Sequence, residues 1–327
     1  MMRMREINFT DIEGIRVGHA QDLKAATGAT VIVSEAGATV GVDVRGGAPG
    51  TRETDLLDPV NLVDKVHAVL LAGGSAFGLD AAAGVMQYLE ERKIGFDVGV
   101  TRVPIVCAAV LFDLTIGDHR VRPDKEMGYR ACLNAGSKEC RQGSVGAGTG
   151  ATVGKILGIG RAMKSGLGCH ALQVGDLKVG ALVAVNCLGD VVDPLSGKKL
   201  AGPLNEDRRT LADTEALMID AYADRRNLFS GNTTIGVVAT NAALTKAQAT
   251  KLASMAHDGY ARTMRPAHSM VDGDTIFAMS TGSVEAGLSV VGLLAARVME
   301  RAVVAAVTNA EPLCGLTSWA DLDSAAG

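Results

Sequence analysis

The sequence predicts an α/β protein of the α+β kind, in which helices cover antiparallel or mixed β-sheets in layers. Strand-like segments come in groups and helix-like segments come in groups, so the strict β–α–β alternation of a doubly wound parallel fold is missing. Hydrophobic residues make up 47% of the 327 residues, which is enough material for an extensive core. No segment repeats with a fixed period.

The first third of the chain predicts a hairpin followed by a strand–turn–helix unit. Residues 30–45 alternate apolar with small or polar residues on both sides of a Gly-Ala turn, as a β-hairpin does. Residues 67–72 (HAVLLA) predict a short strand that ends at Gly73-Gly74. Apolar residues then recur at helical spacing over 79–93, which predicts a helix.

Glycine dominates the middle of the chain. It is so frequent over 143–160 that we expect neither a helix nor a well-packed strand, but a loop that brings the backbone close to a neighbour. Residues 181–192 are interpreted as a buried strand, a Gly-Asp turn and a returning strand. Residues 193–207 are expected to form a surface connection.

The last third of the chain predicts three helices and two strands. Apolar spacing indicates the helices, Thr245 is a suitable cap for the second of them, and β-branched residues indicate a central strand. In chain order, the expected elements are a helix over 209–228, a strand over 233–240, a helix over 245–262, a strand over 274–280 and a long buried helix over 285–307.

Charge and composition argue against nucleic acids and membranes as partners. The 32 basic and 36 acidic residues are interspersed and the net charge is −4, so no broad basic face is expected. Aromatic residues, at 3%, supply few stacking platforms. The first residues lack a signal-peptide core, and the apolar stretch 287–307 is interrupted by charges. The six cysteines form no CxxC pair, as is typical of a reducing compartment. We expect a cytoplasmic protein that binds a small peptide or amide substrate.

Several familiar site motifs fail on inspection. Residues 150–155 (GATVGK) resemble a Walker loop, but the spacing is one residue short and Ile156 replaces the Ser or Thr that binds Mg²⁺. Residues 146–151 approximate a dinucleotide fingerprint, yet no clear strand precedes them. The histidines lack metal-ligand spacing, and Ser75 in GGSAFG does not lie in a GxSxG motif. We therefore expect neither a metal nor a cofactor.

The turn before the predicted strand 233–240 carries the most informative residue. Residues 231–235 (GNTTI) place Thr233 at the beginning of that strand. A threonine hydroxyl needs an adjacent base in order to attack, and a free α-amine, with a pKa near ~7.7–8, is such a base. Cleavage between Asn232 and Thr233 would create this amine. Taken alone, the segment is better explained by an ordinary turn before a strand.

Five longer segments carry a family resemblance. They are IEGIRVGHA (12–20), AGGSAFGLDAAAGV (72–85), ATVGK (151–155), GNTTIGVVATNAAL (231–244) and VDGDTIFAMSTG (271–282). In this order, and over nearly the whole chain, they resemble the self-processing N-terminal-nucleophile hydrolase family of the DmpA aminopeptidase, the β-peptidyl aminopeptidases and the nylon-oligomer hydrolase NylC.

The resemblance implies a fold and an assembly. The fold would be a layered αββα sandwich that forms one domain over residues 1–327. Self-cleavage would divide the domain into fragments 1–232 and 233–327. The fragments would stay intertwined and associate as homo-oligomers, often tetramers of such cleaved pairs.

The resemblance also implies site residues. Thr233 falls on the nucleophile, and Asn232 on the residue whose carbonyl group is attacked during maturation. Lys155 matches the active-site lysine of the NylC type, which would stabilise negative charge or assist proton transfer. Asn186 in VAVNCLGD matches the asparagine whose side-chain amide donates to the developing oxyanion.

Two aspartates complete the implied site. Asp272 and Asp274 match the acidic pair near the NylC cleavage point, where they would orient the threonine amine or tune proton transfer. Because they alternate along an extended segment, we expect them to face the same side. The aminopeptidase branch generally has serine as its nucleophile, so this chain is more similar to the NylC-like branch. That branch implies internal cleavage of ω-amino-acid amides.

Two other functions stay open at this point. An acyltransferase of the ornithine acetyltransferase type shares self-cleavage before a threonine and would transfer the acyl group to an amine instead of water. A non-catalytic binding protein would keep the fold and remain uncut.

Overall fold

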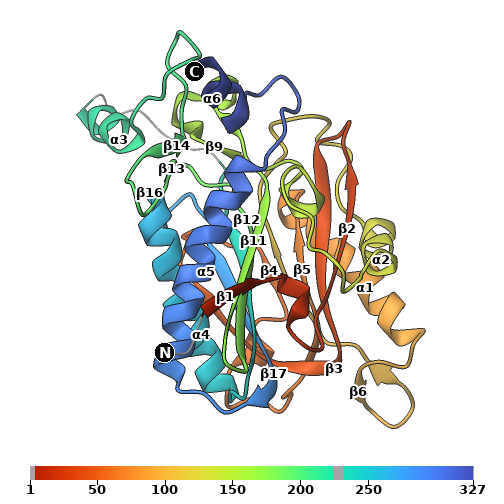
Figure 1. The fold of residues 1–327 in the computed structure, drawn as a ribbon. Coiled ribbons are helices and arrows are strands. Elements are labelled where there is room, and N and C mark those ends of the chain that lie inside the picture. The colour runs from red at the N-terminus through yellow and green to blue at the C-terminus, as the bar shows by residue number, and fades with distance from the viewer. Residues whose placement is uncertain (1–3, 224–230, 327) are drawn as a thin grey trace.

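The computed structural model describes residues 4–223 and 231–326, and its main strands form one continuous mixed sheet (Figure 1). Most neighbouring strands are antiparallel, whereas β15–β17 and β5–β8 are parallel, so the predicted mixed sheet is confirmed. The strand order is β1 (Met4–Ile7), β11 (Leu167–Val174), β12 (Leu177–Ala184), β15 (Ile235–Ala242), β17 (Thr275–Val284), β3 (Thr27–Val44), β5 (Val66–Ala72), β8 (Val106–Val110) and β4 (Thr51–Arg52), with β2 (Arg16–Asp22) also paired to β3.

Strand β3 joins the two halves of this sheet. Its residues 39–44 pair with β17, and its residues 27–33 pair with β2 and β5. The pairing register shifts between Val33 and Ala38, and Gly37 has a positive φ of 77° there. The hairpin predicted over 30–45 is therefore wrong. The chain passes from one half of the sheet to the other at the Gly-Ala pair instead of reversing, because each half of β3 finds its own neighbours.

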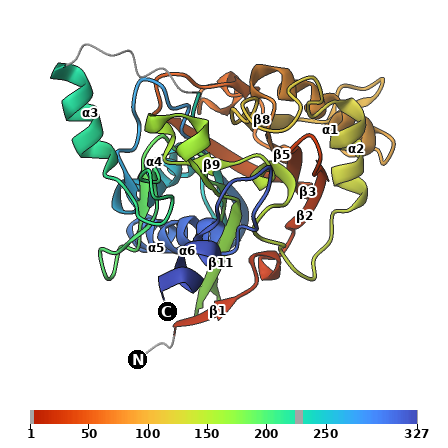
Figure 2. The same ribbon diagram turned by 90° about the horizontal axis from the view of Figure 1, so that it is seen from above.

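The two halves of the sheet pack face to face, and helices cover their outer faces. Helices α4 (Lys246–Thr263) and α5 (Leu288–Thr308) cover one half, and α1 (Ala81–Glu90) and α2 (Lys125–Leu133) cover the other. A third core lies between the halves and combines residues of both, such as Leu71 from β5 and Phe277 from β17. The layers follow one another from left to right in Figure 1, and Figure 2 shows the same separation from above. The predicted αββα sandwich is confirmed.

Strand β15 is buried on both of its faces. Val237 and Ala239 point into the core between the sheet halves, while Val238 points into the core beneath α4 and α5. This double burial explains the dense β-branched run and confirms the predicted central strand. On β3, which pairs with the other side of β17, a Cβ at Gly41 would lie 2.1 Å from the backbone nitrogen of Thr250, so α4 packs directly on the sheet.

The helices of the last third follow the prediction closely. The side chain of Thr245 accepts a hydrogen bond from the backbone of Gln248, whose side chain bonds back to the cap, and α4 begins at the next residue. Helix α5 matches the long helix expected over 285–307. Helix α3 (Thr214–Ala223) matches part of the helix expected over 209–228, and residues 224–230 lie outside the described residues.

The segment after β12 differs from the prediction. Residues 190–192 do not return along β12, because β13 (Asp190–Val192) leaves the main sheet and pairs with β14 (Lys199–Ala201) and β16 (Met264–Arg265). The expected surface connection over 193–207 thus contains a strand. The glycine-rich segment 143–160 is a loop with short 3-10 turns, as predicted, except that Thr152 and Val153 form the buried strand β9, which pairs with β10. The remaining elements are β6 (Phe96–Asp97), β7 (Arg102–Val103), β9 (Thr152–Val153), β10 (Met163–Lys164) and α6 (Trp319–Ala326).

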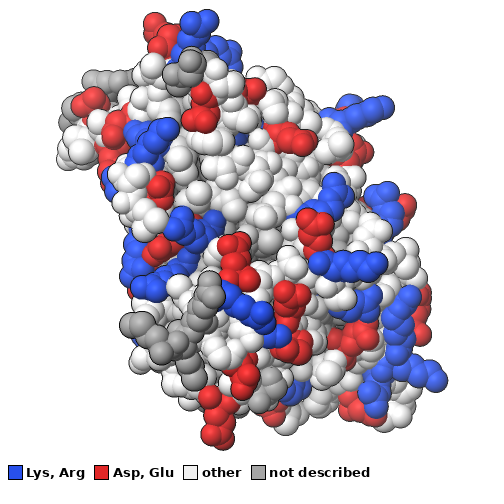
Figure 3. All heavy atoms as spheres, in the orientation of Figure 1, with Lys and Arg blue, Asp and Glu red and all other residues white. Residues whose placement is uncertain are grey.

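Basic and acidic side chains are interspersed over the face shown in Figure 3, around a central area without charged residues. Within the described residues, the helices are too short or too polar to cross a membrane.

Candidate active site

One edge of the sheet brings the predicted site residues together. Strands β15 and β17 are parallel neighbours, so the segments that precede them, with Thr233 and Asp274, meet at this edge. Strand β12 is antiparallel to β15, so its end lies at the same edge and is followed by Asn186. Each of the five predicted side chains is at most 5% exposed; they are Thr233, Lys155, Asn186, Asp272 and Asp274.

Thr233 is held in the uncut chain with its hydroxyl beside the peptide bond that precedes it. The backbone nitrogen of Thr233 donates to the carbonyl oxygen of Asn186 at 3.1 Å. The hydroxyl group contacts the carbonyl oxygen of Asn232. Across from it, a Cβ at Gly273 would lie 2.7 Å from the Thr233 Oγ1. Because residue 273 is a glycine, no side chain crowds the Thr233 hydroxyl from this direction.

Lys155 is buried, and its amino group is bound to three oxygens. Its Nζ donates to the carbonyl oxygen of Thr152 at 3.1 Å, and to the carbonyl and side-chain oxygens of Asn186 at 2.9 Å each. Burial lowers the pKa of Lys155 to about 8. An ammonium group has three N–H donors and no acceptor, so the three oxygens fit its charged form. The carbonyl oxygen of Asn186 bonds both to this cation and to the nitrogen of Thr233.

Asn186 is fixed through both ends of its side-chain amide. Its Oδ1 accepts from Lys155 and from the backbone nitrogen of Thr152 at 3.0 Å. Its Nδ2 donates to the carbonyl oxygen of Phe112 at 3.0 Å. An amide nitrogen carries two N–H groups, and the bond to Phe112 occupies one of them.

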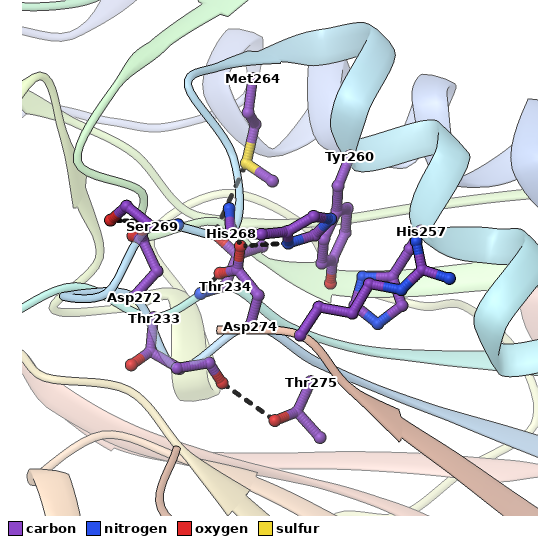
Figure 4. Close-up of polar contacts among 12 residues, drawn as sticks. Thr233, Thr234, His257, Tyr260, Met264, His268, Ser269, Asp272, Asp274 and Thr275 are labelled. Carbon is purple, nitrogen blue, oxygen red and sulfur yellow. Dashed lines mark hydrogen bonds and ion pairs between the residues drawn. The ribbon is translucent and has the colours of Figure 1, made fainter. Parts of the chain in front are cut away.

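Asp274 contacts the residue that follows the predicted nucleophile. One carboxylate oxygen, Oδ1, accepts from the backbone nitrogen of Thr234 at 2.9 Å. The other oxygen, Oδ2, accepts from the backbone nitrogen of His268 at 3.1 Å and lies 2.9 Å from the Nδ1 of the same residue (Figure 4). Asp274 thereby connects the segment before β15 with the turn before β17 through hydrogen bonds.

Asp272 is bound through one oxygen only. Its Oδ2 accepts from the backbone nitrogen of Ser269 at 3.1 Å and from the Ser269 hydroxyl. Its buried Oδ1 has no hydrogen-bond partner among the described residues. Burial raises the pKa of Asp272, and the neighbouring carboxylate of Asp274 raises it further.

Three contributors to this arrangement were not identified from the sequence. The carbonyl of Phe112 orients the Asn186 amide, and His268 and Ser269 bind the two aspartates. Phe112 acts through its backbone, which no side-chain pattern reveals. His268 and Ser269 lie in an irregular turn. In the sequence, their closeness to the two aspartates was the feature that could have indicated a contact with them. In the described part of the chain, no group of three His, Cys, Asp or Glu side chains is arranged to hold a metal ion.

Comparison with known proteins assigns the chain to a family. Residues 8–319 match the family described as peptidase family S58. The chain belongs to peptidase family S58. A protein of Mycobacterium tuberculosis named uncharacterized aminopeptidase is 44% identical, over 96% of this chain and 97% of that protein. The 6-aminohexanoate-oligomer endohydrolase of Paenarthrobacter ureafaciens is 34% identical, over 86% of this chain and 77% of the relative.

Solved structures support the fold of this S58 member. An L-aminopeptidase D-Ala-esterase/amidase from Ochrobactrum anthropi, described as a new variant among the Ntn hydrolase fold, superposes with a TM-score of 0.71 at 20% identity, covering 94% of this chain and 87% of that one. A β-aminopeptidase of a Burkholderia species gives a TM-score of 0.69 at 20% identity, covering 99% and 95% of the two chains. The chain is therefore a hydrolase of a peptidase family with an N-terminal-nucleophile hydrolase fold.

The raised pKa of Asp272 predicts a pH dependence of stability. The folded chain retains a proton on Asp272 at pH values where the unfolded chain has lost it, so stability falls as pH rises from the ordinary value of 3.8 through the raised one. Asp272→Asn cannot ionise and should lack this loss. Urea unfolding between about pH 4 and pH 7 measures the free energy of unfolding of the Thr233→Ala chain with and without Asp272→Asn. If the two plots of this free energy against pH are parallel, the expectation is wrong.

Proposed function

We propose that the chain cuts its own peptide bond between Asn232 and Thr233, and that the new N-terminal Thr233 hydrolyses amide bonds. The substrates are small peptides or ω-amino-acid oligomers. The observation that carries this proposal is the buried contact between the Thr233 hydroxyl and the Asn232 carbonyl oxygen. The Asn186 carbonyl oxygen that accepts from the Thr233 nitrogen also accepts from Lys155.

In the proposed maturation, the Thr233 Oγ attacks the carbonyl carbon of Asn232. The bond from that carbon to the nitrogen of Thr233 breaks, the nitrogen takes up the proton that the hydroxyl loses, and an ester links Asn232 to the Thr233 Oγ. Water then hydrolyses the ester, which leaves a carboxylate on Asn232 and both a free amine and a free hydroxyl on Thr233.

In the proposed reaction with substrate, the freed amine is the general base. It takes the proton of the Thr233 hydroxyl during attack and passes it to the leaving amine, while the acyl group forms an ester with the Thr233 Oγ. Water then hydrolyses this ester, which releases a carboxylate product and restores the hydroxyl. The hydrogen bond to the Asn186 carbonyl supports the orientation of this nitrogen. The charge of Lys155, bound to the same carbonyl, favours the neutral form of the amine. The second amide N–H of Asn186 is the proposed donor to the oxyanion, a contact typically worth ~10²–10³ in rate.

The names of the relatives suggest two modes of cleavage that an experiment can distinguish. Some are named aminopeptidases and others endohydrolases of 6-aminohexanoate oligomers. We infer internal cleavage, in line with the NylC-like threonine and aspartates. Incubation with a linear 6-aminohexanoate oligomer should release internal fragments early, whereas the release of single residues alone would indicate aminopeptidase action. Addition of an amine acceptor should not divert the acyl group from water, which tests the acyltransferase alternative.

Intact-mass measurement tests the central proposal. The purified chain of 33.7 kDa is expected to give two fragments, 1–232 and 233–327, whose masses add up to that of the chain plus one water. Sequencing of the second fragment should begin at Thr233. A chain that remains whole after prolonged incubation would favour the non-catalytic binding protein instead.

The proposed cellular location follows from the cysteine pattern and the first residues of the chain, and the proposed assembly follows from the family resemblance. We infer a cytoplasmic enzyme that forms homo-oligomers, as tetramers of cleaved pairs. Native mass spectrometry of the matured protein tests the assembly, because four copies of each fragment should appear in one complex.

A further inference from the structure

We infer that His268 is a positioning residue that holds Asp274, and through it the backbone at the nucleophile, in the reactive arrangement. The inference rests on the proposed function, because it concerns the same site. The backbone nitrogen of His268 and its ring Nδ1 lie 3.1 Å and 2.9 Å from the Oδ2 of Asp274. The other carboxylate oxygen accepts from the nitrogen of Thr234, so the carboxylate is held from both sides.

The surroundings of the His268 ring determine which nitrogen donates. The ring packs against two residues of α4, with centroid distances of 4.8 Å to His257 and 6.2 Å to Tyr260 (Figure 4). Its Nε2 is buried and has no hydrogen-bond partner among the described residues. A proton on Nε2 would therefore be unpaired in a buried place, whereas a proton on Nδ1 faces the carboxylate. The geometry thus favours the tautomer with the proton on Nδ1, which donates to Asp274.

The carboxylate of Asp274 is the charged group that the His268 ring contacts directly, and the other titratable groups nearby lie further from the ring. On α4, burial lowers the pKa of His257 to about 4, so that ring is neutral at pH 7. The Nε2 of His257 lies 3.0 Å from the carbonyl oxygen of Asp43, a residue of β3. The Asp43 side chain forms an ion pair with Arg45. The carboxylate of Asp272 also interacts electrostatically with that of Asp274.

The consequence for the nucleophile is geometric. Donors to a carboxylate favour its ionised form and fix its orientation. Without the imidazole donor, Asp274 can rotate away from the nitrogen of Thr234, and the residue before it, Thr233, loses its fixed position. A misplacement of about 1 Å at the reacting atoms costs on the order of 10²-fold in rate.

The backbone of His268 dictates the choice of variants. Its φ is 60°, in the left-handed region that asparagine and glycine adopt more readily than other residues. His268→Asn places an amide N–H near the position of Nδ1 and keeps the donor. His268→Gly removes the donor and accepts the same backbone conformation. The two variants therefore separate the hydrogen bond from backbone strain.

The rate of self-cleavage, its rescue by asparagine and the kinetic constants of the matured enzyme are the readouts. We expect His268→Gly to cleave about 10²-fold more slowly than the unaltered chain. His268→Asn should cleave at close to the unaltered rate. In matured His268→Gly, kcat should fall while KM stays unchanged.

Several outcomes would overturn the inference. Equal cleavage rates in His268→Gly and the unaltered chain would show that the donor has no effect, and equally slow Asn and Gly variants would assign the effect to ring packing. If His268→Gly does not fold, His268→Asp replaces it, because it has nearly the shape of the Asn variant but puts a carboxylate against Asp274. Failure of the unaltered chain to cleave would contradict the proposed function, not this inference alone.

Discussion

Replacing Thr233 with alanine should leave the chain in one piece and abolish amide hydrolysis. The variant lacks the hydroxyl that contacts the Asn232 carbonyl oxygen, and without cleavage no α-amine appears at position 233. Both the nucleophile and the base are then missing, so a loss of at least about 10³-fold in hydrolysis is expected. The side chain is buried but small, so the uncut variant should fold normally.

Two matched variants make this test specific. Thr233→Ser keeps a hydroxyl and should still cleave. Thr234→Ser alters the adjacent threonine, whose hydroxyl accepts from the nitrogen of Asn186 at 3.3 Å, and should also cleave before residue 233. Time courses of intact mass at fixed pH give all the rates. Cleavage of Thr233→Ala at the same bond would refute the assignment of the nucleophile.

Local sequence patterns correctly predicted those helices and strands whose apolar residues recur with one regular period along the whole element. Helix α4 has an apolar stripe and a capping box, and β15 has a β-branched run, so both were found within about two residues of their ends. The hairpin over 30–45 was wrong because alternation describes one long strand as well as two short ones. Which neighbours pair with each half of β3 is a long-range property, and it decides between the two.

The candidate site shows the same division between local and long-range information. The family resemblance supplied Thr233, Lys155 and Asn186, yet nothing in their sequence spacing says that Lys155 binds the same carbonyl oxygen as the nitrogen of Thr233. That contact exists because β12 ends where β15 begins, at one edge of the sheet. The role of His268 likewise depends on the shape of a turn, which periodic patterns do not encode.

Replacing Lys155 with methionine should slow self-cleavage by about 10²–10³-fold, as expected when one stabilising group of an oxyanion site is lost. Methionine fills much of the same volume but supplies neither a charge nor a donor. The oxygens of Thr152 and Asn186 then lose their hydrogen bonds to Lys155, although both Asn186 oxygens keep a backbone donor. A loss of stability is therefore also expected, about 1.5–3 kcal/mol for a hydrogen bond to a charged group.

The chain offers a control that separates these two losses. Lys246 is also buried and also donates to three carbonyl oxygens, those of Leu56, Asn61 and Val63, none of which belongs to the candidate site. Lys246→Met should destabilise the fold to a similar extent and leave the cleavage rate unchanged. If both variants cleave equally slowly, the effect of Lys155 is structural, and its proposed catalytic role is wrong.

The pH dependence of Lys155 distinguishes its two proposed roles. Burial lowers its pKa from 10.5 to about 8, so between these values the folded chain holds fewer protons than the unfolded chain, and stability rises with pH. If the ammonium acts as a cation, cleavage slows over the same range in which stability increases. If the neutral amine transfers protons, cleavage accelerates with pH up to about 8 and is level above it. The three oxygens around Nζ favour the cation, and Lys155→Met, which cannot titrate, should lose both the added stability and the alkaline limb of the cleavage profile.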